Sequence, residues 1–465
     1  MSAVPGTKRP QYVSFYKAVD EDESRWVNLL GAGVTSSAVP SSNSEAQRLY
    51  DEGNRSIQLG APWAATTSLE RVVKLEPTWV DAWLLLGSAR IMASRPDAAV
   101  DAFRKAIALD PSNVRAYETL AKSLISLHRT EEAIQVWRDL LKVGADHREA
   151  SENLAVLLVD AGKYPEARPV LEKAIEQDAA DPNLRFQLGR TYIQLDEEEK
   201  ASEQFQKAME LRPDPEMRSA IAYSLAEAKR HLPDALRYAE EALQETDSRT
   251  AAIRLDSDVR EGYGLMGDLA AEWDTLGWVH FRMGHLDAAQ RYTEAAWRLS
   301  PLPAIGDHLA QIYEKQGKKT LAFHTYALAL AVLNVGGDPV LREKLVSRVT
   351  AGGSQSSSWV SNQKEVEEMR TFSLKGFGES DRSAFFAVVS TNGSNVLEVK
   401  FLNGPEELRE AESAIATIKF GTVFPDDSPT RIFRGGTLSC VRMWKGCRFI
   451  LFPYKPRDLF PHKTL

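Results

Sequence analysis

The sequence predicts a mainly α-helical protein, a right-handed α–α superhelix of stacked helix pairs followed by a small α+β domain. Two observations predict this fold class. A pattern of small and bulky residues recurs every 34 residues over most of the chain. After about residue 362 the hydrophobic residues no longer follow a helical period and begin to alternate, as in strands.

Alanine at position 20 of a 34-residue unit is the most regular feature of the repeat. The units start at Ala46, Val80, Val114, Arg148, Pro182 and Glu216, and the frame resumes at Ala270 and Pro303. The alanines at position 20 are Ala65, Ala99, Ala133, Ala167, Ala201, Ala235, Ala289 and Ala322. Position 8 is glycine or alanine in seven of the eight units, and position 24 is bulky in most units. Stacked helix pairs need such small residues, because a larger side chain would push the two helices of a pair apart.

This pattern resembles the tetratricopeptide repeat family over about residues 46 to 336. The resemblance implies eight helix pairs within residues 46–350 and a concave groove that binds a protein or an extended peptide. Residues 250–269 interrupt the frame, and their spacing predicts a helical insert that lengthens the first helix of unit seven. We expect Asp256 to Asp258 to cap that helix, and residues 338–349 to form a helix that closes the array.

The C-terminal part predicts a strand–strand–helix–strand–strand order within residues 363–455, after a flexible linker at 351–362. Segments 383–391 and 395–402 flank Asn392-Gly393, which is typical of a hairpin turn. Residues 406–420 predict an amphipathic helix, and two strands follow within 430–443 and 447–453. This order resembles the TonB carboxy-terminal domain. An unrelated domain of one helix on a sheet is the alternative, and residues 456–465 form a tail.

The only two cysteines, Cys440 and Cys447, lie in the two closing strands. A turn centred on Met443-Trp444 would place them opposite each other, where they could form a disulfide. A turn centred on Lys445-Gly446 would separate them, and both would then be buried, reduced strand residues. The sequence leaves both possibilities open.

Residues 1–45 predict an N-terminal extension and linker, and they resemble the end of a domain in chains with a secreted, transglutaminase-like front half. The resemblance implies a second hypothesis, in which the chain is the non-catalytic C-terminal portion of a secreted or envelope transglutaminase-like or hydrolase protein. The chain as given shows no signal peptide and no apolar stretch long enough to span a membrane. We therefore expect a cytoplasmic protein, or a periplasmic or envelope protein if the N-terminus is truncated.

Motifs that carry chemistry are weak in this sequence. The Gly-Ala-Gly at 31–33 lacks the Lys-Ser/Thr pair of a phosphate loop, and no Gly-x-Ser-x-Gly elbow is present. His280 and His285 are five residues apart, which does not suit two ligands on one helix face. The net charge of −8 argues against a nucleic-acid partner. We expect no cofactor, no metal and no catalysis, and the sequence does not set the oligomeric state.

The groove is the predicted binding site. Positions 2, 5 and 9 of the first helix in each unit should face inward. In units three to five the candidates are Arg115, Glu118, Lys122, Asn153, Phe186, Gln187 and Arg190. The cations could bind carboxylates, the amides could bind peptide backbone, and the aromatic ring could be an anchor for one side chain. The alternative is an ordinary solvated helix surface.

Overall fold

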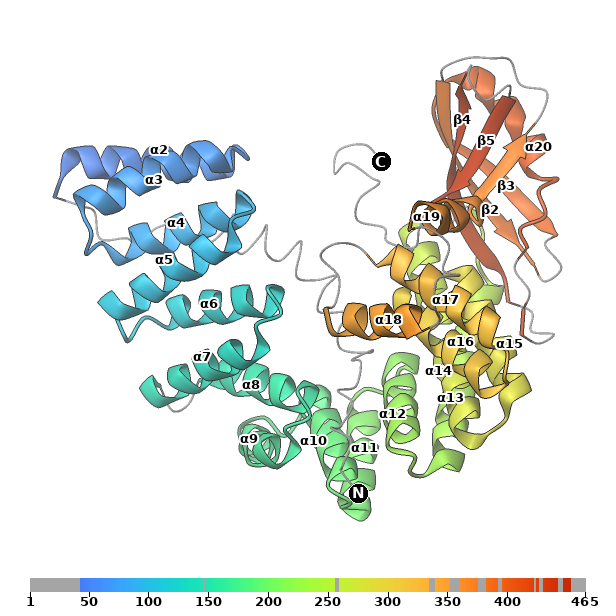
Figure 1. Ribbon diagram of the computed structural model, residues 1–465, viewed down its shortest axis with the longest axis horizontal. Coiled ribbons are helices and arrows are strands. Elements are labelled where there is room, and N and C mark those ends of the chain that lie inside the picture. The colour runs from blue at the N-terminus through green and yellow to red at the C-terminus, as the bar shows by residue number, and fades with distance from the viewer. Residues whose placement is uncertain are drawn as a thin grey trace. The chain divides into compact units, whose positions relative to one another are not determined.

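The computed structural model describes residues 42–144, 147–255, 259–333, 339–351, 359–374, 382–391, 395–421, 424–425, 430–441 and 446–452. The chain falls into two compact units, Met1–Lys207 and Ala208–Leu465. Figure 1 shows helices throughout the first unit, and helices followed by a sheet in the second. The Gly-Ala-Gly at 31–33, the predicted cap at 256–258 and the predicted tail at 456–465 lie outside the described residues.

The first unit consists of antiparallel helix pairs in the predicted frame (Figure 1). The pairs are α2 (Ser44–Gln58) with α3 (Pro62–Leu75), α4 (Val80–Met92) with α5 (Pro96–Leu109), α6 (Val114–Ser126) with α7 (Thr130–Val143), α8 (Arg148–Asp160) with α9 (Tyr164–Gln177), and α10 (Pro182–Gln194) with α11 (Glu198–Leu211), which continues past the end of the unit. The predicted helical repeat fold is confirmed.

The small residues lie where the two helices of a pair come closest. A Cβ added to Gly87 would be 2.3 Å from the ring of Phe103, and one added to Gly189 would be 2.6 Å from the ring of Phe205. These glycines occupy position 8 and the two rings occupy position 24. All eight alanines at position 20 are fully buried. Position 8 is therefore small because the bulky residue at position 24 fills the space beside it.

The second unit continues with the pairs α12 (Pro215–Ala228) with α13 (Leu232–Ala251), α14 (Val259–Met283) with α15 (Leu286–Leu299), and α16 (Pro303–Lys315) with α17 (Lys319–Val332), then α18 (Pro339–Ala351) and α19 (Trp359–Glu368). Helix α14 has 25 residues and begins inside the predicted insert, so the insert does lengthen the first helix of its unit. The predicted linker at 351–362 is wrong at its end, because α19 begins at Trp359.

Within the described residues, the C-terminal sheet has five antiparallel strands in the order β1-β5-β4-β2-β3. The strands are β1 (Thr371–Leu374), β2 (Arg382–Ser390), β3 (Val396–Asn403), β4 (Ile432–Val441) and β5 (Gly446–Leu451). The predicted order omitted β1, whose four residues are too few to show an alternation. The predicted helix at 406–420 is a 3-10 turn, η2 (Glu406–Glu410), followed by the short α20 (Ala411–Ile415).

The sheet is covered on both faces. Phe386 and Val388 of β2 pack with Leu408 and Ile415 on one side. On the other side, Phe433 of β4 lies edge-on to Tyr263 of α14, with ring centroids 5.3 Å apart. Strand residues buried on both faces explain why β2 has a nearly continuous apolar sequence.

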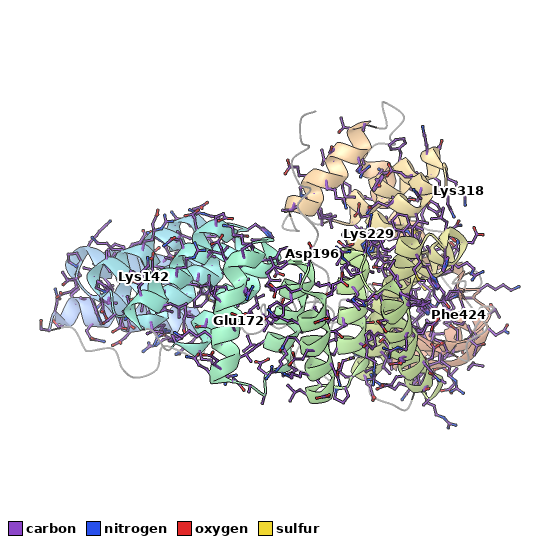
Figure 2. All side chains as sticks on the ribbon, turned by 90° about the horizontal axis from the view of Figure 1, so that it is seen from below. Lys142, Glu172, Asp196, Lys229, Lys318 and Phe424 are labelled. Carbon is purple, nitrogen blue, oxygen red and sulfur yellow. A yellow bond between two sulfur atoms is a disulfide. The ribbon has the colours of Figure 1, made fainter. Side chains whose placement is uncertain are left out.

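The insert is the surface on which the sheet packs. A Cβ on Gly262 would lie 2.8 Å from the ring of Phe433, so the first turns of α14 need a glycine there. Phe424, labelled in Figure 2, packs against Trp273 of the same helix at 5.8 Å. The sheet is thus held by direct packing on α14, in addition to its covalent connection.

Cys440 of β4 and Cys447 of β5 are direct partners in the strand register. Their sulfur atoms are joined in a disulfide, and both residues are buried beneath η2 and α20. The register is the one that places the two cysteines opposite each other.

A matched pair of substitutions on α5 tests the close packing at position 20. Ala99→Leu adds three carbons at a fully buried position, and we expect it to lower the free energy of unfolding by about 1–3 kcal/mol. Ala108→Leu, on the exposed face of the same helix, should change it by less than about 0.5 kcal/mol. Urea denaturation measures both, and equal effects would contradict the repeat register.

Candidate functional site

The first helices of successive pairs form a continuous surface in each unit. We call the surface of α2, α4, α6, α8 and α10 the first inner face, and that of α12, α14, α16 and α18 the second inner face. Side chains from neighbouring helices interact along both surfaces, as the following contacts show. Each face is described by itself.

Charged side chains of α6 meet those of α8 on the first inner face. Lys122 Nζ lies 2.9 Å from a carboxylate oxygen of Glu149, and His147 Nε2 lies 3.5 Å from Glu118. Burial, followed by the charge of Glu149, raises the pKa of Glu118, while Lys122 and His147 oppose that rise. Arg115 is exposed on the same helix. Three predicted site residues are thus brought together here.

The remaining predicted residues are less available than the sequence suggested. Phe186 is only 7% exposed and packs against Phe205, with ring centroids 6.2 Å apart, so its predicted role as a surface anchor is wrong. Gln187 is buried and accepts a hydrogen bond from Arg190. Arg190 also pairs with Asp160 at 3.2 Å. The amide of Asn153 donates to a backbone carbonyl on its own helix. The contact of Arg190 thus joins two neighbouring repeats, whereas the other contacts lie within one helix or one helix pair.

At the start of the first inner face, Tyr50 stacks on Trp79 with ring centroids 4.5 Å apart. Its hydroxyl is buried and has no hydrogen-bond partner among the described residues. Burial, with a further contribution from Asp81, raises the pKa of Tyr50 to about 12, and Arg115 opposes the rise. Burial also raises the pKa of Asp81. Arg115 is therefore close enough to affect the pKa of both Tyr50 and Asp81, which extends the charged surface towards α2 and α4.

The second inner face carries a buried polar network that the sequence analysis did not identify. His308 of α16 is 1% exposed, and its Nδ1 lies 2.9 Å from Asp274 Oδ2 on α14. Its Nε2 lies 3.5 Å from the hydroxyl of Tyr223 on α12. Burial, together with Glu227, Asp274 and Asp307, raises the pKa of Tyr223 well above its usual range. Three consecutive first helices thus meet around one imidazole.

Trp278 of α14 forms the wall of this network. Its ring stacks on His308 with centroids 4.0 Å apart, and its Nε1 donates to Glu227 at 2.7 Å. Arg282, one turn further along α14, donates to the backbone carbonyls of Ala226 and Glu227. An aromatic ring, an imidazole and several carboxylates therefore share one buried region.

Comparison with known proteins identifies the repeats. Family models of the tetratricopeptide repeat match residues 80–123, 118–182 and 158–222. The chain therefore contains tetratricopeptide repeats. No curated protein matches the chain. The matches end at residue 222, so the resemblance of the C-terminal domain to the TonB domain stays a prediction.

Solved repeat proteins are similar to part of the chain. A crystal structure of MamA is 21% identical, covers 36% of this chain and 92% of its own, and has a TM-score of 0.33. A MamA fragment from Desulfovibrio magneticus RS-1 is 20% identical over 37% of this chain and 98% of its own, with a TM-score of 0.33. YrrB, described as a TPR protein with an unusual peptide-binding site, is 19% identical over 39% of this chain and 93% of its own, also at 0.33.

The repeat frame itself contains the signal for the second inner face. Position 5 is Asp274 in unit seven and Asp307 in unit eight, and position 9 is Trp278 in unit seven. The same positions supplied the candidates in units three to five, so applying the rule to the later units would have found these residues. In unit six the large and small side chains of the two packing positions are exchanged, because Tyr223 stands at position 8 and Ala239 at position 24. In this unit the large side chain is therefore supplied by the first helix and the small one by the second.

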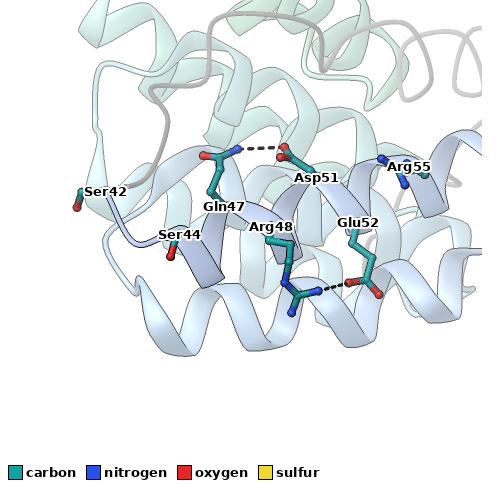
Figure 3. A pocket seen from close by; sticks show the side chains of 7 residues that line it. All are labelled: Ser42, Ser44, Gln47, Arg48, Asp51, Glu52 and Arg55. Carbon is teal, nitrogen blue, oxygen red and sulfur yellow. Dashed lines mark hydrogen bonds and ion pairs between the residues drawn. The ribbon is translucent and has the colours of Figure 1, made fainter.

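Other features of the described residues give less indication of a functional site than the two inner faces. A hollow beside α2 is lined by residues of that helix and by Ser42, two residues before it, and Gln47 and Arg48 bond to side chains one turn away (Figure 3). Within the described part of the chain, no group of three or more histidine, cysteine or acidic residues is placed to hold a metal. None of its helices is long and apolar enough to cross a membrane.

Tyr50→Phe tests the electrostatics of the first inner face. The folded pKa of Tyr50 is about 12 and its ordinary value is 10.0, so the protein should lose stability as the pH rises from 10 to 12, when only the unfolded tyrosine ionises. The phenylalanine variant should lack that contribution and lose less stability in the same window. Urea denaturation at pH 8, 10 and 11.5 measures the difference. If the free energy of unfolding fell equally with pH in the two proteins, the raised pKa would not belong to Tyr50.

Proposed function

We propose that the chain is a non-catalytic scaffold that binds an acidic, extended segment of a partner protein on the first inner face. The observation that supports this most is the row of charged side chains on α6 and α8, formed by Arg115, Glu118, Lys122 and Glu149. Arg115 is exposed, and Lys122 pairs with a half-exposed Glu149.

Exposed ion pairs of this kind contribute little to stability, about 0–1 kcal/mol. A ligand carboxylate can therefore replace Glu149 beside Lys122 at small cost. Arg115 supplies a second cation, and its planar guanidinium suits bidentate recognition of a carboxylate. The surface offers charges for a partner without a nucleophile or a base that is positioned for a reaction.

Charge reversal on the first inner face tests this proposal. The probe is a pool of fluorescent nonapeptides with two central aspartates and randomised flanking residues. The Arg115→Glu/Lys122→Glu variant should bind the pool at least tenfold more weakly than wild type, as measured by fluorescence anisotropy. The matched control, Lys105→Glu/Lys142→Glu, makes the same change of charge on the second helices α5 and α7 (Lys142 is labelled in Figure 2).

Binding by the control should stay within twofold of wild type. If both variants lost affinity for the acidic pool equally, the loss would be explained by the change in net charge alone, and the proposal would fail. It would also fail if wild type did not prefer the acidic pool to a pool with central asparagines. Arg190 is left unchanged because its pairing with the buried Asp160 makes its reversal a folding perturbation.

The disulfide supports an oxidising compartment for the chain. We propose an envelope or secreted location on this basis, because disulfides persist outside the reducing cytoplasm. Both sulfurs are buried under η2 and α20, and the chain has no other cysteine.

Thiol trapping in the native host tests the location. Cells are quenched in acid and treated with a maleimide of high mass before and after reduction. We expect no modification before reduction and modification of two thiols after it. Modification of both cysteines before reduction would overturn the proposed location.

A further inference from the structure

Asp307 is the most deeply buried carboxylate of the second inner face. Its side chain is 0% exposed, although carboxylates are rarely buried without compensation. Its Oδ2 accepts hydrogen bonds from Lys344 at 2.5 Å and from Gln311 at 2.9 Å. Its Oδ1 accepts none from the described residues, and the same holds for Oδ1 of Asp274. Two buried carboxylates of this face therefore retain unused acceptor atoms.

Each carboxylate of this group has one charged or ionisable neighbour in the described residues. Glu227 lies beside Arg282 and Asp307 pairs with Lys344, whereas Asp274 lies beside the imidazole of His308. The raised pKa of Tyr223 has Glu227, Asp274 and Asp307 among its causes, which indicates that all three carboxylates act on the same place. Buried carboxylate oxygens that accept no hydrogen bond, such as Oδ1 of Asp274 and of Asp307, favour a further charged donor.

The two cations differ in how firmly they are held. Arg282 donates to backbone carbonyls of Ala226 and Glu227 at 2.9 and 2.7 Å, which fixes its guanidinium. Lys344 has no bond other than that to Asp307 among the described residues, and its side chain is 27% exposed. Its flexible stem comes from α18, at the edge of the network. Lys344 is thus the exchangeable cation, and it shows what kind of group Asp307 accepts.

We propose that the second inner face binds an arginine side chain of a protein partner, which displaces Lys344 from Asp307. The guanidinium would use the free Oδ1 atoms of Asp307 and Asp274, because its planar fork donates several hydrogen bonds at once. The stacked rings of Trp278 and His308 lie beside Asp274, and the guanidinium of Arg282 already lies 5.4 Å from the centroid of the Trp278 ring, so the rings of this region tolerate an arginine.

This site is separate from the first inner face, and it takes a basic group where the first takes an acidic one. It does not depend on the function proposed above. Its failure would leave the acidic-peptide proposal standing, and the reverse also holds, because the two experiments use different peptide pools and different variants.

The experiment compares two peptide pools on the full chain. One pool contains fluorescent nonapeptides with a central arginine and randomised flanking residues, and the other has citrulline, a neutral isostere, at the centre. Anisotropy gives the affinities. The indole N–H resonance of Trp278, assigned with Trp278→Phe, reports whether binding occurs at the network. We expect the arginine pool to shift this resonance saturably and the citrulline pool to leave it unchanged.

Three variants make the test specific. Lys344→Met removes the competing ammonium, so it should bind the arginine pool at least threefold more tightly than wild type. Arg348→Met removes a cation one turn further along α18 that pairs with Glu314 instead, and it should bind as wild type does. Asp307→Asn should abolish binding while keeping a cooperative melting transition. If Asp307→Asn does not fold, the affinity of Lys344→Met for the arginine pool and the comparison of the two pools on wild type test the proposal.

The proposal is overturned if the two pools bind equally or if neither shifts the Trp278 resonance. It is also overturned if Lys344→Met binds no more tightly than Arg348→Met, or if folded Asp307→Asn retains the wild-type affinity.

Discussion

The close approach of the two helices in each repeat is the constraint on which the rest of this structure depends. It is set where position 8 of the first helix meets position 24 of the second, as Gly87 meets the ring of Phe103. The fully buried alanines at position 20 maintain the same short distance along the pair. Because this packing uses one side of each first helix, the opposite side is left to form the inner faces.

The inner faces differ because their side chains differ in burial. On the first, the ion pairs between α6 and α8 are partly exposed and can exchange with solvent or a ligand. On the second, Asp307 and His308 are removed from water, and their contacts come from three helices and from α18. The size exchange at positions 8 and 24 of unit six contributes to this, since it brings the hydroxyl of Tyr223 into the network.

Helix α14 connects two parts of the second unit. Its first turns pack on the sheet through Gly262 and Tyr263, and its last turns carry Asp274 and Trp278 on the second inner face. Both ends belong to one continuous helix, which is stiff over its length. The insert that interrupts the repeat frame is therefore the element that gives the C-terminal sheet a fixed place beside the repeats of its unit.

The sequence by itself determined the repeat, because a fixed period and fixed small residues follow directly from helix packing. It also indicated most of the strands from their alternation, but it omitted β1 and overextended the helix at 406–420, which are decided by long-range pairing and packing. Only the tertiary structure decided which groove residues are available. Phe186 and Arg190 occupy inward positions of the repeat, yet Phe205 and Asp160 from neighbouring helices bury one and pair with the other. The turn between the cysteines also stayed ambiguous until strand register fixed it, because local turn preference is weaker than the pairing of two buried strands.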